Sequence, residues 1–208
     1  MHLHEILRAQ LQIAQERFGA LHILETGTIR GETKNYAADD GWSTLCFADW
    51  TQHHGGQVTS IDLDVQVALR VLAHRQEWVA GKIRDHGPDA PPLEPLRVNL
   101  LEDHSVHALG VLLLHQNGLD RASSGPVHVA YLDSDNDPTL ILCEYLLVTQ
   151  MMPQGGIVMV DDADFTEGAL ARKAHAIAPW LRQRAQPYEI VQRSGEGYST
   201  GVLITEIR

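Results

Sequence analysis

The chain has 208 residues, 44% of them hydrophobic, and its 16 lysines and arginines against 27 aspartates and glutamates give a formal charge of -11. This length and apolar content suit one α/β domain with a sizeable core, residues 1–208, and leave little room for a second. The negative charge disfavours nonspecific binding to nucleic acid or to anionic membranes, so a small-molecule partner is expected. No apolar run approaches the roughly 20 residues of a membrane span, and the polar start is not signal-like, which favours a cytoplasmic protein.

The chain contains two cysteines, Cys46 and Cys143. They are far apart in sequence and outside any CxxC spacing, so neither a disulfide scaffold nor a structural zinc site is expected. Both fall on predicted helices, where we expect buried and inert thiols. A reducing compartment fits this pattern.

The predicted elements alternate along the chain. Apolar residues recur at helical spacing within residues 1–19 and predict a packing helix that Gly19 ends. Strand-like runs then alternate with helical runs, which predicts a mostly parallel sheet with helices on both faces. The last two strands are separated only by SGEGYST, too short for a crossover helix, and must pair as an antiparallel hairpin. The expected strands are 21–25, 58–62, 96–101, 127–132, 156–160, 188–193 and 202–206, and the expected helices are 43–50, 65–84, 105–116, 139–151 and 167–184.

Two strand ends carry residues suited to a nucleoside. The first strand runs into Glu25-Thr-Gly-Thr, and the second ends in Asp62. A glycine such as Gly27 at the end of a buried parallel strand lets the backbone approach a ligand, and a carboxylate ending the neighbouring strand can accept two ribose hydroxyls. These residues predict an adenosine-bearing cofactor.

The connection after the first strand is longer than a strand-to-helix turn requires. Residues 29–40 form an insertion that is expected either to fold over the cofactor or substrate, or to be a passive surface loop. Ser43 then opens the next helix, where hydroxyl and N–H groups suit a carboxylate or a phosphate. Ordinary helix capping explains Ser43 equally well.

Three carboxylates follow the fourth and fifth strands. Asp133 comes after VHVAYL, and Asp161 and Asp162 come after GGIVMV. Adjacent parallel strands lie roughly 4.8 Å apart, so these side chains should converge, and their repulsion calls for a positive charge between them. A hard cation such as Mg²⁺ or Ca²⁺ takes such oxygen ligands. The alternative is that one or more of these acids caps a helix or faces solvent, while Asp135 or Asp137 could substitute as a ligand.

Five motifs lie within about residues 21–164: Glu-Thr-Gly-Thr, Gly-Trp-Ser-Thr-Leu, VTSID, YLDSDND and GGIVMVDDAD. In their order and spacing, these motifs together resemble class I S-adenosylmethionine-dependent methyltransferases, and more narrowly the catechol O-methyltransferase-like group and its cephalosporin hydroxylase-like relatives. The resemblance implies a Rossmann-like three-layer αβα sandwich with a seven-stranded, mostly parallel sheet of order 3-2-1-4-5-7-6, and it suggests a homodimer.

The resemblance implies a role for each matching residue. It places Glu25 and Gly27 beside the methionine part of the cofactor, Ser43 at its carboxylate, Asp62 at the ribose and Asp103 at the adenine, and it makes Thr28 a further cofactor-binding residue. It places Asp133, Asp161 and Asp162 on the metal, and Asp133 acts in catalysis through that metal. Relatives often carry a His or Lys just after the first of these acids, whereas this chain has Asn136, so no general base is identified.

The sequence therefore predicts a divalent-cation-dependent O-methyltransferase that acts on a small-molecule hydroxyl. Two alternatives stay open. A nicotinamide-dependent oxidoreductase would use a similar glycine turn and strand-end acid, although the GxGxxG spacing is absent and the terminal hairpin is unexplained. A noncatalytic cofactor-binding or assembly protein of the same fold would explain the missing base.

Overall fold

The structure is a computed structural model that describes residues 1–31, 42–85, 96–119, 125–164, 173–193 and 200–208. Its strands are β1 (Leu21–Thr26), β2 (Gly56–Asp62), β3 (Val98–Glu102), β4 (Val129–Leu132), β5 (Ile157–Val160), β6 (Tyr188–Gln192) and β7 (Gly201–Glu206). Its helices are α1 (Leu3–Phe18), α3 (Ser43–His54), α4 (Gln66–Asp85), α5 (Ser105–Leu114), the π-helical turn η1 (His115–Leu119), α6 (Pro138–Thr149) and α7 (Ala174–Gln183).

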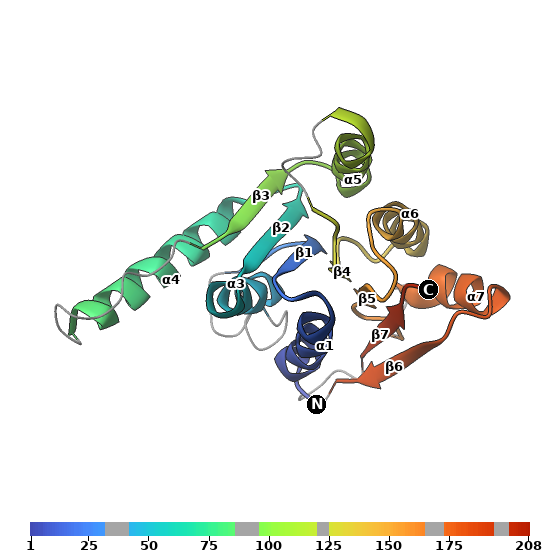
Figure 1. The fold of residues 1–208 in the computed structure, drawn as a ribbon, viewed down its shortest axis with the longest axis horizontal. Coiled ribbons are helices and arrows are strands. Elements are labelled where there is room, and N and C mark those ends of the chain that lie inside the picture. Colours follow the sequence, from blue (N-terminus) through green and yellow to red (C-terminus); the bar gives the residue numbers. More distant parts are fainter. Residues whose placement is uncertain (32–41, 86–95, 120–124, 165–172, 194–199) are drawn as a thin grey trace.

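The strands form one seven-stranded sheet of order β3-β2-β1-β4-β5-β7-β6 (Figure 1). The first five strands in this order are parallel, and β7 pairs antiparallel with both β5 and β6. The predicted fold class, strand order and terminal hairpin are therefore confirmed. Because strand order reverses between β1 and β4, the crevice at their carboxyl ends is where a ligand binds in open α/β sheets.

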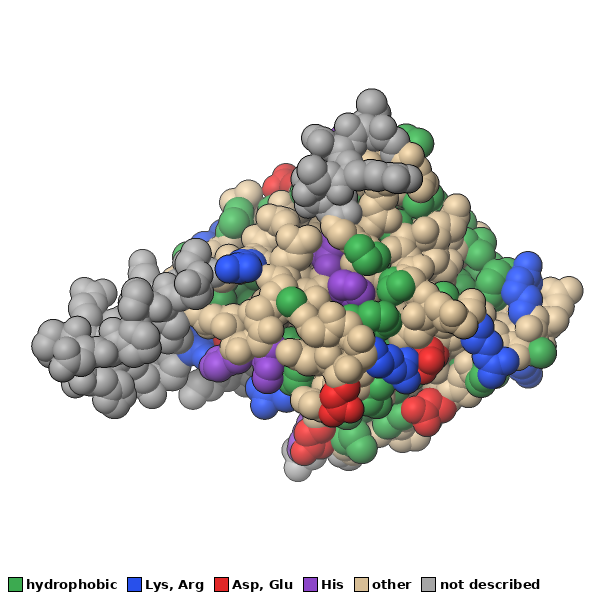
Figure 2. All heavy atoms as spheres, in the orientation of Figure 1, with side chains coloured by type: hydrophobic (Ala, Val, Ile, Leu, Met, Phe, Trp, Pro, Cys, Tyr) green, Lys and Arg blue, Asp and Glu red, His purple; other side chains and the backbone are tan. Residues whose placement is uncertain are grey.

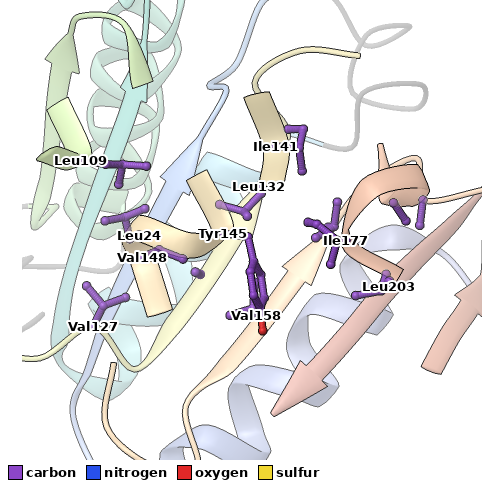
Figure 3. Packing of buried hydrophobic residues seen from close by; sticks show 14 of the residues in the cluster. Leu24, Leu109, Val127, Leu132, Ile141, Tyr145, Val148, Val158, Ile177 and Leu203 are labelled. Carbon is purple, nitrogen blue, oxygen red and sulfur yellow. The ribbon is translucent and has the colours of Figure 1, made fainter. Parts of the chain in front are cut away.

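Helices cover both faces of the sheet. On one face, Leu24 of β1, Leu132 of β4 and Val158 of β5 pack against apolar side chains of α5, α6 and α7 (Figure 3). On the other face, buried residues of α1 and α3 pack on Leu21, Ile23 and the alternate residues of the other central strands. The central strands β1, β4 and β5 are buried along their whole length. This burial explains why β4 and β5 are apolar throughout, whereas the polar residues of β1 need buried partners.

Some details differ from the sequence-based expectations. Helix α3 continues to His54, so the two histidines before Gly55 lie in its last turn and not in a loop. Cys143 is exposed on α6, whereas Cys46 is buried as expected. The apolar pattern of α6 surrounds the helix, so it could not identify the outward-facing position. Of the predicted insertion, residues 32–40 lie outside the described residues. None of the described helices has both the length and the apolar content needed to cross a bilayer.

Glycine at the start of β2 allows the tight pairing of β1 with β2. Gly56 has a φ of +105°, and a Cβ there would lie 2.0 Å from the carbonyl oxygen of Leu21. Gly19 also has a positive φ, +75°, but a Cβ there would meet nothing within 4 Å. A side chain at either position would strain the backbone, but only a side chain at Gly56 would also overlap a neighbouring strand. Comparing the two positions therefore separates the two effects.

We expect Gly56→Ala to lower the free energy of unfolding by about 1 to 3 kcal/mol more than Gly19→Ala does, because both residues strain the backbone but only Gly56 adds overlap with a neighbouring strand. Urea denaturation of the two variants measures this difference. Equal losses would show that β1 and β2 do not approach as described.

Candidate active site

The carboxyl ends of β1, β2, β4 and β5 meet at one edge of the sheet, and backbone hydrogen bonds fix their alignment. The Gly27 amide donates to Ile61 O at 2.8 Å, the Asp133 amide to Thr26 O at 2.8 Å and the Asp161 amide to Leu132 O at 3.2 Å. The residues that follow these strands therefore lie together at this edge, which we call the mouth of the sheet. Among them are most of the site residues that the sequence predicts.

Gly27 makes the closest approach at this mouth. Its φ is +82°, and a Cβ there would lie 2.4 Å from the carbonyl oxygen of Asp133. Only glycine combines this conformation with such contact to a neighbouring backbone. Gly27 was predicted to let a ligand approach the backbone. In the structure, it lets the backbone of Asp133 approach, and this contact brings the ends of β1 and β4 together.

Glu25 is fully buried inside a cage of hydroxyl groups. Ser43 donates to one carboxylate oxygen at 2.5 Å, and Thr44 and Ser60 donate to the other at 2.6 Å each. Burial raises the pKa of Glu25 to about 7, and the three hydroxyl bonds oppose this rise. Because Ser43 and Thr44 open α3, the cage ties the start of that helix to β1 and β2. The Ser43 hydroxyl is committed to Glu25, so the backbone N–H groups of this helix end are what it offers to a ligand.

Asp62 ends β2 and faces the mouth with a side chain that is 17% exposed. Its Oδ2 accepts from the Thr28 amide at 2.9 Å, and the Arg30 Nε lies 3.8 Å from the same oxygen. Arg30 also donates through Nη2 to Asp133 O at 3.2 Å and to Ser134 O at 2.7 Å. Arg30 therefore spans the mouth from the β2 side to the β4 side.

The loop after β3 lies next to Asp62 on the other side. The Asp103 amide donates to Asp62 O at 2.9 Å, and the Asp103 carboxylate binds His107 Nδ1 at 2.5 Å. This hydrogen bond lowers the pKa of Asp103. Leu63, which the sequence analysis did not select, is 70% exposed directly after Asp62. An aliphatic side chain exposed beside a polar mouth offers apolar surface to a flat ring.

Asp133, Asp161 and Asp162 come together as predicted, with one carboxylate oxygen from each lying within 4.8 Å of the others. Two cationic side chains bind them. Lys173, directly before α7, bonds to Asp133 and lies 3.7 Å from Asp162. Arg193, directly after β6, places Nη1 3.0 Å from both oxygens of Asp161 and 3.7 Å from Asp162.

Burial and charge act in opposite directions in this cluster. Burial raises the pKa of Asp133 to about 6, against the lowering effect of Lys173. Burial also opposes the charge on Lys173, but the fields of the three aspartates outweigh it and raise the pKa of Lys173. Lys173 is therefore a cation at neutral pH, although its side chain is only 4% exposed.

Asp162 has an unusual backbone conformation, with a φ of +45°. Non-glycine residues in the left-handed region are uncommon, and they cluster at functional sites. This conformation turns the chain immediately after β5, so that Asp161 and Asp162 both reach the cations. The Asp162 side chain is 32% exposed, the most accessible of the three.

A second buried glutamate lies beneath the cluster on the opposite face of the sheet. Glu144 of α6 accepts from Thr26 Oγ1 at 2.8 Å and from Ser134 Oγ at 2.5 Å, and Ser105 at the start of α5 also bonds to it. Burial raises the pKa of Glu144. Through these hydrogen bonds, Glu144 links Thr26, which precedes Gly27, to Ser134, which follows Asp133.

Sequence reasoning did not identify Lys173, Arg193 or Glu144. Lys173 is 40 residues from Asp133 and Arg193 is 32 residues from Asp161, so no spacing motif reveals these pairs. Glu144 had a usable signal, because it falls on the same helical stripe as Ile141, Tyr145 and Val148, which are all buried. A carboxylate on an apolar stripe needs buried partners.

A comparison with protein families matches residues 38–163 to a family described as a methyltransferase domain, which is more than half of the chain. The chain belongs to this methyltransferase family. The match confirms the predicted class, S-adenosylmethionine-dependent methyltransferase. A search of curated proteins found no match.

Solved structures of this fold agree with the assignment. The O-methyltransferase TomG from Streptomyces achromogenes, involved in tomaymycin synthesis and solved with S-adenosylmethionine, is 16% identical with a TM-score of 0.61, over 99% of this chain and 78% of TomG. An O-methyltransferase from Bacillus cereus solved with S-adenosylhomocysteine is 16% identical with a TM-score of 0.60, over 100% of this chain and 82% of that one. An rRNA methylase from Streptococcus thermophilus is 12% identical with a TM-score of 0.56, over 97% and 96%. These likenesses establish the fold.

The raised pKa of Glu25 makes stability depend on pH. The folded protein holds this proton up to a pH of about 7, whereas the ordinary value is 4.5, so the unfolded chain releases it first. Folding stability from this group therefore falls as pH rises from about 4.5 to about 7, by up to about 3 kcal/mol.

We expect Glu25→Gln to gain stability relative to the unmodified protein across this pH window and to show a constant difference above it. Urea denaturation of both proteins at a series of pH values, without cofactor, measures the difference. Parallel stability profiles between pH 4.5 and 7 would contradict the raised pKa.

Proposed function

We propose that this methyltransferase transfers the methyl group of S-adenosylmethionine to a hydroxyl group of a small molecule. The observation that carries the proposal is the convergence of Gly27, Asp62 and the acids Asp133, Asp161 and Asp162 on one mouth of the sheet. A cofactor cradle and a polar acceptor region are then neighbours, and methyl transfer needs donor and nucleophile in line.

The cofactor half of the mouth comprises the ends of β1, β2 and β3. Asp62 has one oxygen bound to the Thr28 amide, and the other lies 3.4 Å from the Asp64 amide, so it retains capacity to accept a ribose hydroxyl. Leu63 and the Asp103 loop flank it and would border the base. The backbone at Gly27 and the start of α3 would receive the methionine part, whose carboxylate suits a helix N-terminus.

The acceptor half of the mouth comprises the ends of β4 and β5. A hydroxyl nucleophile must lose its proton as it attacks the methyl carbon, and a carboxylate can accept that proton. Asp162 is the most exposed carboxylate of the cluster and lies 3.7 Å from both Lys173 and Arg193. The two cations would stabilise negative charge that develops on the acceptor oxygen.

The divalent cation that the sequence predicts stays a prediction. Three carboxylate oxygens within 4.8 Å form a set that a hard cation accepts. However, Lys173 and Arg193 already bind these carboxylates, so the residues as arranged do not fit a metal ion. The proposed transfer is therefore derived from the side chains of the chain alone.

A small acceptor fits the charge of the protein better than RNA does, even though one similar structure is an rRNA methylase. The formal charge is -11, and the described cations at the mouth already bind carboxylates or carbonyl groups. On the face shown in Figure 2, the described lysines and arginines occur singly or in small groups among acidic and apolar side chains. RNA binding uses continuous basic surface.

We expect S-adenosylhomocysteine to bind in a calorimetric titration and NAD not to bind. Asp62→Asn should lower the affinity for S-adenosylhomocysteine by about 10-fold or more, because a hydrogen bond to a charged acceptor is lost. Glu189→Gln, which removes an exposed carboxylate on β6, should leave the affinity unchanged. If NAD binds and S-adenosylhomocysteine does not, the result would favour an oxidoreductase.

Transfer itself is measured with S-adenosylmethionine labelled in its methyl group and a panel of small phenols, catechols and aliphatic alcohols. Label should appear in at least one hydroxylated acceptor, and Asp162→Asn should lower its rate by at least about 100-fold while S-adenosylhomocysteine still binds, since general-base groups contribute about that much. Cofactor binding with no label transferred to any acceptor would favour a noncatalytic binding protein.

A further inference from the structure

The cations of the acid cluster come from two parts of the chain that carry none of its acids. Lys173 stands immediately before α7, and Arg193 immediately follows the edge strand β6. Their side chains are 4% and 15% exposed, so both charges are inside the protein. Removing such groups from water is costly unless they are paired, and the three aspartates are their partners.

The position of Lys173 is set by the acids and not by the helix that follows it. Lys173 occupies the residue before the first turn of α7 and caps it with no side-chain bond. A cation is unfavourable at a helix N-terminus, where the partial charge of the helix is positive. Its contacts with Asp133 and Asp162 offset this repulsion.

Arg193 complements Lys173 and does not duplicate it. Its Nη1 lies 3.0 Å from each oxygen of Asp161. Arg193 therefore binds both oxygens of the carboxylate to which Lys173 makes no hydrogen bond. Both cations then lie 3.7 Å from Asp162, one near each of its oxygens. Every acid of the cluster therefore faces at least one protein cation.

We propose that Lys173 and Arg193 are the resident counter-charges of this cluster and that they close it to divalent cations. A metal ion needs the carboxylate oxygens as direct ligands, and those oxygens are directed at the lysine and arginine nitrogens. Binding a metal requires Lys173 to leave a buried position, which leaves its charge unpaired. The chain thus supplies from its own side chains the positive charge that a bound metal would bring.

A titration of the protein with Mn²⁺, in which electron paramagnetic resonance measures the concentration of free ion, tests the proposal without cofactor or acceptor. Its outcome is therefore independent of the proposed methyl transfer. We expect the unmodified protein to show no saturable site with a Kd below about 1 mM, the weak end of the range for protein cation sites. Lys173→Met should create a single site at least about 10-fold tighter, because Asp133 then lacks its cation.

Three further variants locate the effect. Adding Asp133→Asn to Lys173→Met should abolish the gained site, since the freed ligand is removed. Arg17→Met is the matched control, because Arg17 pairs with Glu206 at 2.8 Å on the surface, and its loss should create no site. Lys173→Arg keeps the charge and should leave Mn²⁺ binding as weak as in the unmodified protein.

Tight one-to-one Mn²⁺ binding by the unmodified protein would overturn the proposal and support the metal predicted from sequence. A Lys173→Met variant that folds and gains no Mn²⁺ site would also overturn it. If this variant is too unstable to purify, thermal unfolding of the unmodified protein decides. We expect the same Tm in 10-fold different Mn²⁺ concentrations and in EDTA, and a Tm that rises with Mn²⁺ would contradict the proposal.

Discussion

The site depends on one steric constraint, the absence of a side chain at Gly27. The backbone of Asp133 lies so close that a Cβ at Gly27 would be 2.4 Å from its carbonyl oxygen. This approach continues the pairing of β1 with β4 beyond the strands themselves, through the bond from the Asp133 amide to Thr26 O. The first residue after β1 and the first residue after β4 are therefore held against each other, with no flexible side chain between them.

The carboxylates around this contact are buried by two different means. Glu25 and Glu144, on opposite faces of the sheet, are each surrounded by three hydroxyl donors. Hydroxyls satisfy the oxygen atoms without cancelling the charge, and burial accordingly raises the pKa of both groups. Asp133 and Asp161 instead bind cations. The glutamates therefore tie helix starts to strand ends, while the charged cluster joins the ends of β4 and β5 to Lys173 and Arg193.

The fold could be predicted because its signals are local. Apolar runs with strand length, helical stripes and the short segment before the last strand determined the order of elements along the chain, and rules of connection then gave a mostly parallel sheet with a terminal hairpin. The order of the strands across the sheet was expected from the resemblance to class I methyltransferases. The acids at strand ends could also be predicted to converge, because parallel strands place their carboxyl ends at one edge. Asp133, Asp161 and Asp162 confirm that expectation.

The charge balance could not be predicted, because it depends on contacts between distant segments. The expected convergence of the three aspartates predicts a positive charge among them, and a metal ion was the predicted carrier of that charge. The structure places Lys173 and Arg193 there, and neither belongs to a motif. The missing lysine after Asp133, where Asn136 stands, is matched by a lysine that reaches the same carboxylate from the start of α7. The expected positive charge is present beside the aspartates, and the two side chains that bring it could be located only from the fold.

Arg193 also links the cluster to the margin of the sheet. It directly follows β6, which is the last strand of the sheet among the described residues and pairs there with β7. Outer strands open more readily than central ones, and their amide protons exchange faster with solvent. Here such opening would withdraw a guanidinium from Asp161 and leave that carboxylate buried without its cation. Fraying of β6 would therefore carry an electrostatic cost at the mouth, far from the strand itself in sequence.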